Sequence, residues 1–218
     1  MAKAEKKEAV YVVIPYARLI NHSLFEKDQY DEKSAPSYKI EVAIPKDHPT
    51  FGDLANAIWD YANDVWGNTV PDLNIDGGPT ISGVLDGEFL ARKREEKGKP
   101  GDAYKGQWVI RANTTFNKYG DDAPGGIAVF DEDVKPVEAL NRNVIYRGCY
   151  VSVKVSLANY EDDKTGAHGI KCYLVAVQKI GDGEPLSSPA DHSSAFKPVG
   201  RAAAAAAGAT TTRRQRKQ

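Results

Sequence analysis

The sequence predicts a mainly β domain of five or six strands with one α-helix. Residues 37–44 and 107–116 alternate between apolar and polar side chains, which is the pattern of a strand with one buried face. Residues 146–160 alternate in the same way over a longer run. Residues 50–66 instead repeat apolar side chains at steps of three and four, which indicates an amphipathic helix.

The other strands follow from shorter patterns. Residues 10–19 form a first apolar run, and residues 127–130 form a short strand. Residues 170–179 are apolar on both faces, so this strand is expected to lie in the centre of the sheet. Pro45 ends the strand at 37–44, because proline has no N–H group to donate to a ladder.

The helix at 50–66 has recognisable ends. Thr50 and Asp53 resemble a capping box, and Gly67 is a typical C-terminal stop. The apolar face of this helix is expected to pack on the open end or the side of a β barrel. Residues 68–106 are rich in Gly, Asp and Pro, and they are expected to form a long irregular insertion.

Composition indicates an ordinary soluble chain. Apolar residues make up 41% of it and charged residues 27%, and no apolar run is long enough for a membrane span, so a cytoplasmic protein is expected. Cys149 and Cys172 lie in strand-like runs and are expected to be buried thiols, with a disulfide between adjacent strands left open. The histidines are scattered, so neither a zinc site nor a cofactor is expected.

No pattern of residues indicates an enzyme. The acidic residues gather in turn-like segments, where acids are usual, and not in a motif for metal-assisted hydrolysis. A Gly-rich phosphate loop is absent from the sequence, as is any local Ser-His-Asp or Cys-His arrangement. Catalysis is therefore not expected.

The predicted domain spans residues 10–186, between a flexible start at 1–9 and a disordered low-complexity tail at 187–218. Residues 201–218 hold five basic and no acidic residues, so the rest of the chain is acidic although the net charge is only −1. Such a domain can bind a polyanion only if its cations gather on one face. The basic run at 92–99 either reaches a phosphate backbone or is a solvated loop, and the loop is favoured because two glutamates interrupt the run.

The strand predicted at 146–160 has two different faces. Its odd positions are apolar and belong in a core, while its even positions place Tyr146, Tyr150, Lys154 and Tyr160 on the other side. Aromatic planes beside a cation suit an unpaired polynucleotide, since bases stack on the rings and the cation meets the phosphates. The alternative is that these tyrosines only pack against a neighbouring strand.

Further cations are expected beside this face. By strand parity, Arg111 and Lys39 point to the solvent side of their strands, where they would meet phosphates. Arg147 falls on the apolar parity, so it either bends round to the ligand or caps the barrel.

Four other aromatic side chains are interpreted as packing residues. Trp108 and Phe116 share the core parity of their strand. Trp59 and Trp66 lie on the predicted helix, where large aromatic side chains are more often buried than exposed.

A series of segments, in order, resembles one family. The segments are ARLINHSLFEK, SYKIEVAIPK, a Trp-containing helix, LDGE, YKGQWVIRAN and, as the most specific, VIYRGCYVSVKVSLANY with GIKCYLVAVQKIGDGEPL. Over residues 10–186 the chain resembles the phage-encoded single-stranded DNA-binding proteins with an OB fold, in the branch related to the podophage replication protein.

The resemblance implies a five-stranded, OB-fold-like antiparallel barrel with one α-helix and long loops, and with single-stranded DNA across an exposed sheet face. It implies a protein that coats and protects transient single strands, without sequence preference, during phage DNA replication, recombination and repair in the infected host cell. It also places a basic residue, Arg18, at the end of the first strand.

Other properties stay open on the resemblance alone. Replication or recombination proteins are implied as further partners, and exposed strand edges leave a homodimer open. The rival interpretation is a phage structural or protein-interaction barrel that does not bind nucleic acid.

One segment departs from the family. Its members commonly end in an acidic tail that recruits polymerases and helicases, whereas residues 210–218 read TTTRRQRKQ. Either this basic end adds a non-specific attraction to the DNA backbone, or it only aids solubility.

Overall fold

The structure, a computed structural model, describes residues 9–29, 31–32, 34–67, 80–81, 83–116, 127–162 and 167–186. Its elements in chain order are β1 (Val10–Asp28), β2 (Ser37–Pro45), α1 (Thr50–Trp66), β3 (Thr80–Ile81), β4 (Val84–Asp86), α2 (Gly87–Glu95), η2 (Asp102–Tyr104), β5 (Gln107–Thr114), β6 (Ala128–Phe130), η3 (Ala139–Val144), β7 (Tyr150–Asp162) and β8 (Ala167–Gly181). Residues 1–8 and 187–218 lie outside the described residues, so the expected flexible start, the tail and the domain limits stay predictions.

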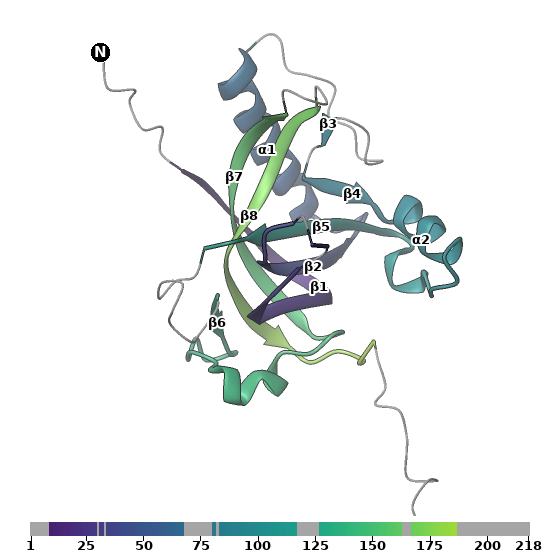
Figure 1. Ribbon diagram of the computed structural model, residues 1–218, viewed down its shortest axis with the longest axis vertical. Coiled ribbons are helices and arrows are strands. Elements are labelled where there is room, and N and C mark those ends of the chain that lie inside the picture. Colours follow the sequence, from purple (N-terminus) through teal and green to yellow (C-terminus); the bar gives the residue numbers. More distant parts are fainter. Residues whose placement is uncertain are drawn as a thin grey trace, which may run out of the picture. The chain divides into compact units, whose positions relative to one another are not determined.

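Five long strands close into a barrel (Figure 1). Their order is β8-β7-β1-β2-β5, and β5 pairs with β8 to complete the ring. All neighbouring pairs of the ring are antiparallel except β5–β8, which is parallel. The structure thus confirms the prediction of a mainly β, OB-fold-like barrel.

The first strand is longer than the sequence pattern indicated. β1 has 19 residues, and it pairs with β7 up to Arg18 and with β2 from Arg18 onward. A strand shared between two neighbours in this way must bend, and the pairing register of β1 shifts after Ile14 and again after Leu19. The bend lets the sheet close on itself.

The core lies inside the barrel, where the predicted alternation holds. The odd positions of β7, from Val151 to Leu157, are buried, and so are the even positions of β2 from Tyr38 to Ile44. α1 adds Leu54, Ile58 and Ala62 to the same cluster, which confirms that its apolar stripe packs on the barrel.

The limits of α1 agree with the prediction, but its N-terminal cap does not. The N-cap residue is Pro49, whose side chain makes no capping hydrogen bond, so the expected capping box of Thr50 and Asp53 is wrong. His48 lies in the turn before the helix, and its Nδ1 accepts a hydrogen bond of 3.2 Å from the Thr50 N–H. Gly67, at φ 59°, ends the helix as expected.

Two of the four aromatic packing predictions are wrong. Trp66 and Trp108 are partly buried against the core, and the Trp108 ring stacks on Phe51 with 4.8 Å between centroids. Phe116 is 69% exposed because β5 ends before it, at Thr114. Trp59 is 54% exposed because it lies one residue off the buried stripe of α1.

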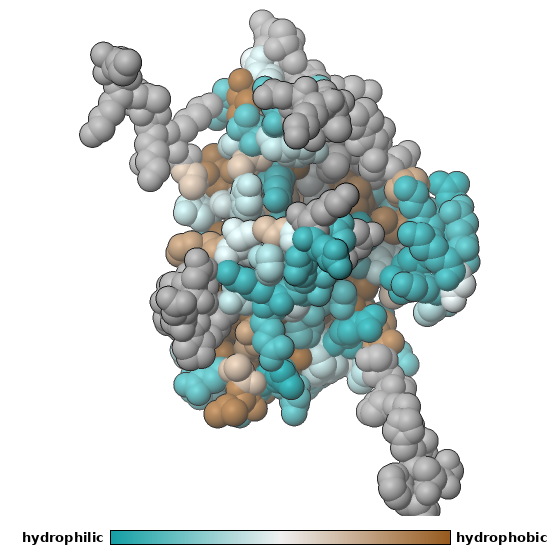
Figure 2. Space-filling view, viewed as in Figure 1, coloured by the Kyte–Doolittle hydropathy of each residue, from teal (hydrophilic) through white to brown (hydrophobic). Residues whose placement is uncertain are grey.

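The insertion contains a second helix that the sequence did not predict. α2 begins after Asp86, whose carboxylate accepts a hydrogen bond of 2.7 Å from the Glu88 N–H. Leu90 and Ala91 of α2 pack with Tyr104 on the outer side of β2 and β5, where a second apolar cluster forms. The other side of α2 is hydrophilic, as the right-hand part of Figure 2 shows.

Both cysteines are free and buried, as expected. Burial raises the pKa of the Cys172 thiol to about 12, and burial also raises the pKa of Cys149. Both side chains belong to the core cluster of the barrel.

Two features are absent from the described residues. None of their helices has the length and apolar character needed to cross a membrane. Within the same residues, no three His, Cys, Asp or Glu side chains come together as a group that could hold a metal ion.

Candidate nucleic-acid interface

The outer surface of three adjacent strands carries exposed tyrosine rings. β7 lies between β1 and β8 in the sheet, and Figure 1 shows β7 and β8 side by side over most of their length. Because successive residues of a strand point to opposite faces, the even positions of β7 point away from the core. We call the outward residues Tyr11, Tyr150, Lys154, Lys171 and Tyr173 the tyrosine face.

The register of the sheet aligns two of these rings. Tyr11 of β1 is opposite Ser156 of β7, and Ser156 is opposite Tyr173 of β8. The serine between them is small, so the two rings flank a low position in the middle of the sheet. Tyr11 is 56% exposed and Tyr173 is 38% exposed. Such ring faces are available to flat ligands.

Each of these two rings has a lysine beside it. The Lys154 Nζ lies 4.7 Å from the centroid of the Tyr11 ring, and the Lys171 Nζ lies 4.7 Å from that of Tyr173. These are cation–π distances, so the ammonium groups are held close to the rings. Neither lysine forms an ion pair with an acid in the part of the chain that the structure describes. Their charge is therefore free for an anion.

Tyr150 and Lys154 are the two predicted site residues that belong to the tyrosine face. Both lie on the outer side of β7, and Tyr150 is 39% exposed. Tyr160 has the same parity but lies farther along β7, opposite Gly169 and beyond the part of β7 that pairs with β1. Its ring is half-buried, and this burial raises the pKa of its hydroxyl.

The expectation that Tyr146 extends the same outward row is wrong. β7 begins only at Tyr150, because Gly148 adopts a φ of 109° and turns the chain before it. The Tyr146 ring packs against the core, and its hydroxyl lies 3.0 Å from both Asp182 Oδ1 and the Gly183 carbonyl. The same oxygen accepts a hydrogen bond of 3.1 Å from the Gly183 N–H. Tyr146 therefore joins the turn before β7 to the segment after β8.

A buried lysine completes this junction. Lys179 of β8 is only 8% exposed, and its Nζ lies 2.7 Å from Asp182 Oδ1 and 3.2 Å from Glu132 Oε1. The hydrogen bond to Asp182 raises the pKa of Lys179 against the opposing effect of burial. The pKa of Asp182 is lowered, mainly by the hydrogen bond that its carboxylate accepts from Lys179 and to a lesser extent by the one from Tyr146.

We expect Tyr146→Phe to lower the free energy of unfolding by about 1–3 kcal/mol, because it leaves the Gly183 N–H without its partner. Urea unfolding measures this change. The matched control is Tyr150→Phe, since the structure shows no hydrogen bond from the Tyr150 hydroxyl to any described residue. Equal stability of the two variants would contradict a structural role for Tyr146.

The two predicted arginines near Tyr150 contact the backbone of the protein. The Arg18 Nη2 donates to the Glu184 carbonyl at 3.1 Å, and its Nε is buried without a hydrogen-bond partner among the described residues. The Arg147 Nε donates to the Ile20 carbonyl at 2.8 Å. This contact resembles the capping alternative for Arg147, and a contact of either arginine with DNA stays a prediction.

Arg111 and Lys39 lie farther round the barrel, and carboxylates accompany both. Tyr173 is opposite Asn113 of β5, and Asn113 is opposite Lys39 of β2, so the outer surface is continuous. Lys39 pairs with Asp28 at 3.0 Å, and Arg111 pairs with Glu41. Parity predicted their outward direction correctly, but not these ion pairs.

Glu41 also accepts a hydrogen bond from Tyr104 of the insertion. Burial and this bond raise the pKa of Tyr104 to about 12. The insertion thus covers one end of the β2–β5 outer face, and the outward aromatic rings lie instead on β1, β7 and β8.

Comparison with known families decides the relationship of the chain. The family model of the single-stranded DNA-binding protein of Enterobacter phage Enc34 matches residues 10–207. The chain belongs to this family. The resemblance that the sequence motifs indicated is thereby confirmed.

Three solved structures have a fold similar to that of the present chain. The Enc34 protein in complex with single-stranded DNA has 20% identity and a TM-score of 0.60, over 85% of this chain and 97% of that chain. A second structure of the Enc34 protein has 21% identity and a TM-score of 0.57, over 88% of this chain and 95% of that chain. The bacteriophage T7 single-stranded DNA-binding protein gp2.5 has 14% identity and a TM-score of 0.50, over 88% and 96%. No curated protein sequence matches significantly.

Sequence reasoning missed two rings of the tyrosine face in this Enc34 family member. Tyr11 precedes a run of hydrophobic residues, and Tyr173 lies in a strand interpreted as apolar on both faces. Ile170, Cys172 and Leu174 are buried and share one parity, so that parity alone places Lys171 and Tyr173 outward. The signal was present in the sequence.

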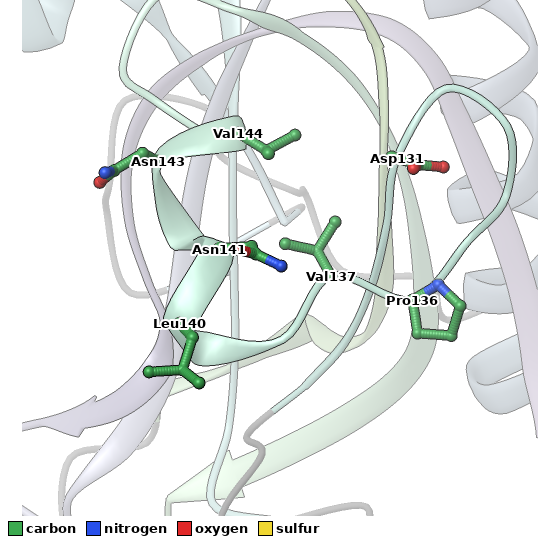
Figure 3. Close-up of a pocket in the computed structure, with 7 residues that line it drawn as sticks. All are labelled: Asp131, Pro136, Val137, Leu140, Asn141, Asn143 and Val144. Carbon is green, nitrogen blue, oxygen red and sulfur yellow. The ribbon is translucent and has the colours of Figure 1, made fainter.

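A shallow pocket lies away from these rings, between the turn after β6 and the helix η3. Its volume is about 260 Å³. Its lining residues are Asp131, Pro136, Val137, Leu140, Asn141, Asn143 and Val144. Figure 3 shows Val137 and Asn141 pointing towards each other and Leu140 pointing away. The lining mixes apolar and amide groups and has neither aromatic rings nor cations, so it does not resemble a site for nucleic acid.

Proposed function

We propose that this chain is a single-stranded DNA-binding protein that holds the DNA on its tyrosine face. It would coat and protect transient single strands during phage DNA replication, recombination and repair, in the cytoplasm of the infected cell. Membership of the Enc34 family supports the ligand. One observation supports the location: exposed rings with unpaired lysines beside them, on the outer surface of β1, β7 and β8.

The chemistry of the tyrosine face suits bases without regard to sequence. Every base has a π face, so a ring such as Tyr11 or Tyr173 stacks on any of the four, with roughly 1–3 kcal/mol for each stack. Lys154 and Lys171 lie beside these rings, where they would meet the phosphates that join the stacked bases. Single strands should bind better than a duplex, because the bases of a duplex already stack on each other.

The other predicted site residues would have supporting roles. Tyr160 would extend the stacking surface along β7. Lys39 and Arg111 would meet phosphates only by exchanging their present carboxylate partners. Arg18 holds the backbone after β8 through the Glu184 carbonyl, and Arg147 joins the turn before β7 to β1 through the Ile20 carbonyl.

The direct test is a titration of labelled oligonucleotides followed by fluorescence anisotropy. We expect single-stranded oligo-dT to bind more tightly than a duplex of the same length, with an affinity that falls as salt rises. An RNA oligonucleotide in the same titration shows whether the protein prefers deoxyribose or ribose in the strand. Equal or absent binding of all three at low salt would overturn the proposal and favour the rival β-barrel function.

Lys154→Ala should reduce the slope of log affinity against log salt by about 0.7, which is the value for one phosphate of a single strand. The measurement is the same titration at four or more salt concentrations. Lys135→Ala is the control, since Lys135 pairs with Asp133 in the turn after β6. If the Lys154 variant keeps the parent slope, Lys154 does not contact the DNA.

A further inference from the structure

The first strand contains a bulge next to the tyrosine face. Ile14 is opposite Val153, and Ala17 is opposite Val151, so two residues of β1 face the single residue Ser152. These two are Pro15 and Tyr16. Proline has no N–H group, so its position in a bulge leaves no ladder donor unpaired.

Tyr16 has a backbone conformation that tyrosine rarely adopts. Its φ is +56°, in the left-handed region where glycine is the usual residue. For a bulky side chain this conformation is strained, and it persists only where the surrounding structure imposes it. Glycine or asparagine would fit the same backbone with less strain.

The Tyr16 ring makes no contact with the described residues that would offset this backbone strain. The Tyr16 side chain is 63% exposed, whereas Ile14 and Ala17 on either side of the bulge are fully buried. No ring contact or hydrogen bond joins its side chain to another described residue. A glycine would serve the barrel at least as well, so the need for a ring lies outside the folded chain.

The bulge changes the direction in which Tyr16 points. Ile14 points inward, so unbroken alternation would turn residue 16 inward as well. The extra residue resets the alternation: Ala17 and Leu19 point inward, and Tyr16 points outward. Tyr16 thus lies beside Ser152, between the register positions of Lys154 and Tyr150 on β7.

We propose that Tyr16 is a further base-stacking residue, which the bulge holds outward beside the tyrosine face. The inference rests on the proposed function of that face, and it adds a ring to β1 between Tyr11 and the position of Arg18 opposite Tyr150. The DNA would then cross from β8 over β7 to the bulge of β1. Strained backbone conformations gather at functional sites in this way, where the strain fixes a side chain before the ligand arrives.

The decisive variants are Tyr16→Gly and Tyr16→Phe in the full chain. Tyr16→Gly should weaken oligo-dT binding by about 5- to 150-fold, the equivalent of one lost stack. Its melting temperature should equal or exceed that of the parent, because glycine removes the backbone strain. Tyr16→Phe should bind within about twofold of the parent, since stacking needs the ring and not the hydroxyl.

Tyr16→Asn separates the ring from the backbone, because asparagine tolerates the left-handed conformation but has no aromatic face. It should lose as much affinity as Tyr16→Gly. Parent-like binding by either variant, or a lower melting temperature of Tyr16→Gly, would overturn the inference. If the parent binds oligo-dT and Tyr150→Ala weakens that binding while Tyr16→Gly does not, only the inference fails. If the parent itself does not bind, the proposed function fails.

Discussion

Tyr150→Ala should weaken the binding of single-stranded DNA of any sequence by roughly 5- to 150-fold, which corresponds to one lost stack of about 1–3 kcal/mol. The effect should be alike for oligo-dT and for mixed sequences, because the ring offers a plane and not a pattern of donors and acceptors. Fluorescence anisotropy with labelled oligonucleotides measures it. Tyr150 is the first residue of β7, the middle one of the three strands, and it is opposite Arg18 of β1 and Gly181 of β8.

The control for this variant is Tyr150→Phe, which keeps the ring and should bind like the parent. Tyr150→Ala should also lose less stability than a core substitution, since the Tyr150 side chain is 39% exposed. A further variant, Tyr11→Ala, should also weaken the binding of single-stranded DNA. The double variant of Tyr11 and Tyr150 then tests whether the two rings contribute to the affinity independently. Unchanged affinity in both single variants would show that the DNA lies on another face of the barrel.

Gly148→Ala should destabilise the fold by about 2–6 kcal/mol, through backbone strain and overpacking together. Gly148 has a φ of 109°, which an alanine rarely adopts. An added Cβ would also lie 2.1 Å from the carbonyl oxygen of Glu184. Urea unfolding at constant protein concentration measures the loss.

Gly181→Ala is the matched control, because a Cβ at that position meets nothing within 4 Å. It should change stability little, and the reduced freedom of its unfolded chain could raise it slightly. A Gly148→Ala variant as stable as Gly181→Ala would show that the contact between the turn before β7 and the segment after β8 is loose.

Local patterns in the sequence predicted the elements whose partners lie in one core. The alternation from Ser37 to Ile44 gave the limits of β2 almost to the residue, and the stripe of Leu54, Ile58 and Ala62 gave those of α1. Both patterns have an unbroken period, and one buried face decides them. The barrel then follows from the number of strands and the family resemblance.

The prediction failed where a single residue interrupts the period. Gly148 turns the chain, so Tyr146 left the outward row that parity assigned to it. Pro15 and Tyr16 reset the parity of β1, so a period counted from Ile14 places Tyr16 inward, although its side chain is exposed. A bulge depends on how two strands pair, and a period counted along one strand contains no information about its partner.

Pairings between distant segments were also invisible in the sequence. Glu41 and Arg111 are opposite each other only because of the register between β2 and β5. The ion pair that neutralises Arg111, a predicted phosphate contact, could therefore not be predicted without that register. α2 has only three buried residues, and it packs on an outer face of the barrel that no local pattern marks. Propensity is a weak signal for so short a helix.

The two buried thiols can report local unfolding of the barrel. Cys149 immediately precedes the first residue of β7, and Cys172 lies within β8, so both are in or next to strands that carry the rings. Only a thiolate attacks alkylating reagents, and a thiol with a pKa raised by burial is almost entirely protonated at neutral pH. Alkylation of these sulfurs therefore requires a transient local unfolding of the barrel, and the alkylation rate measures how often that unfolding occurs.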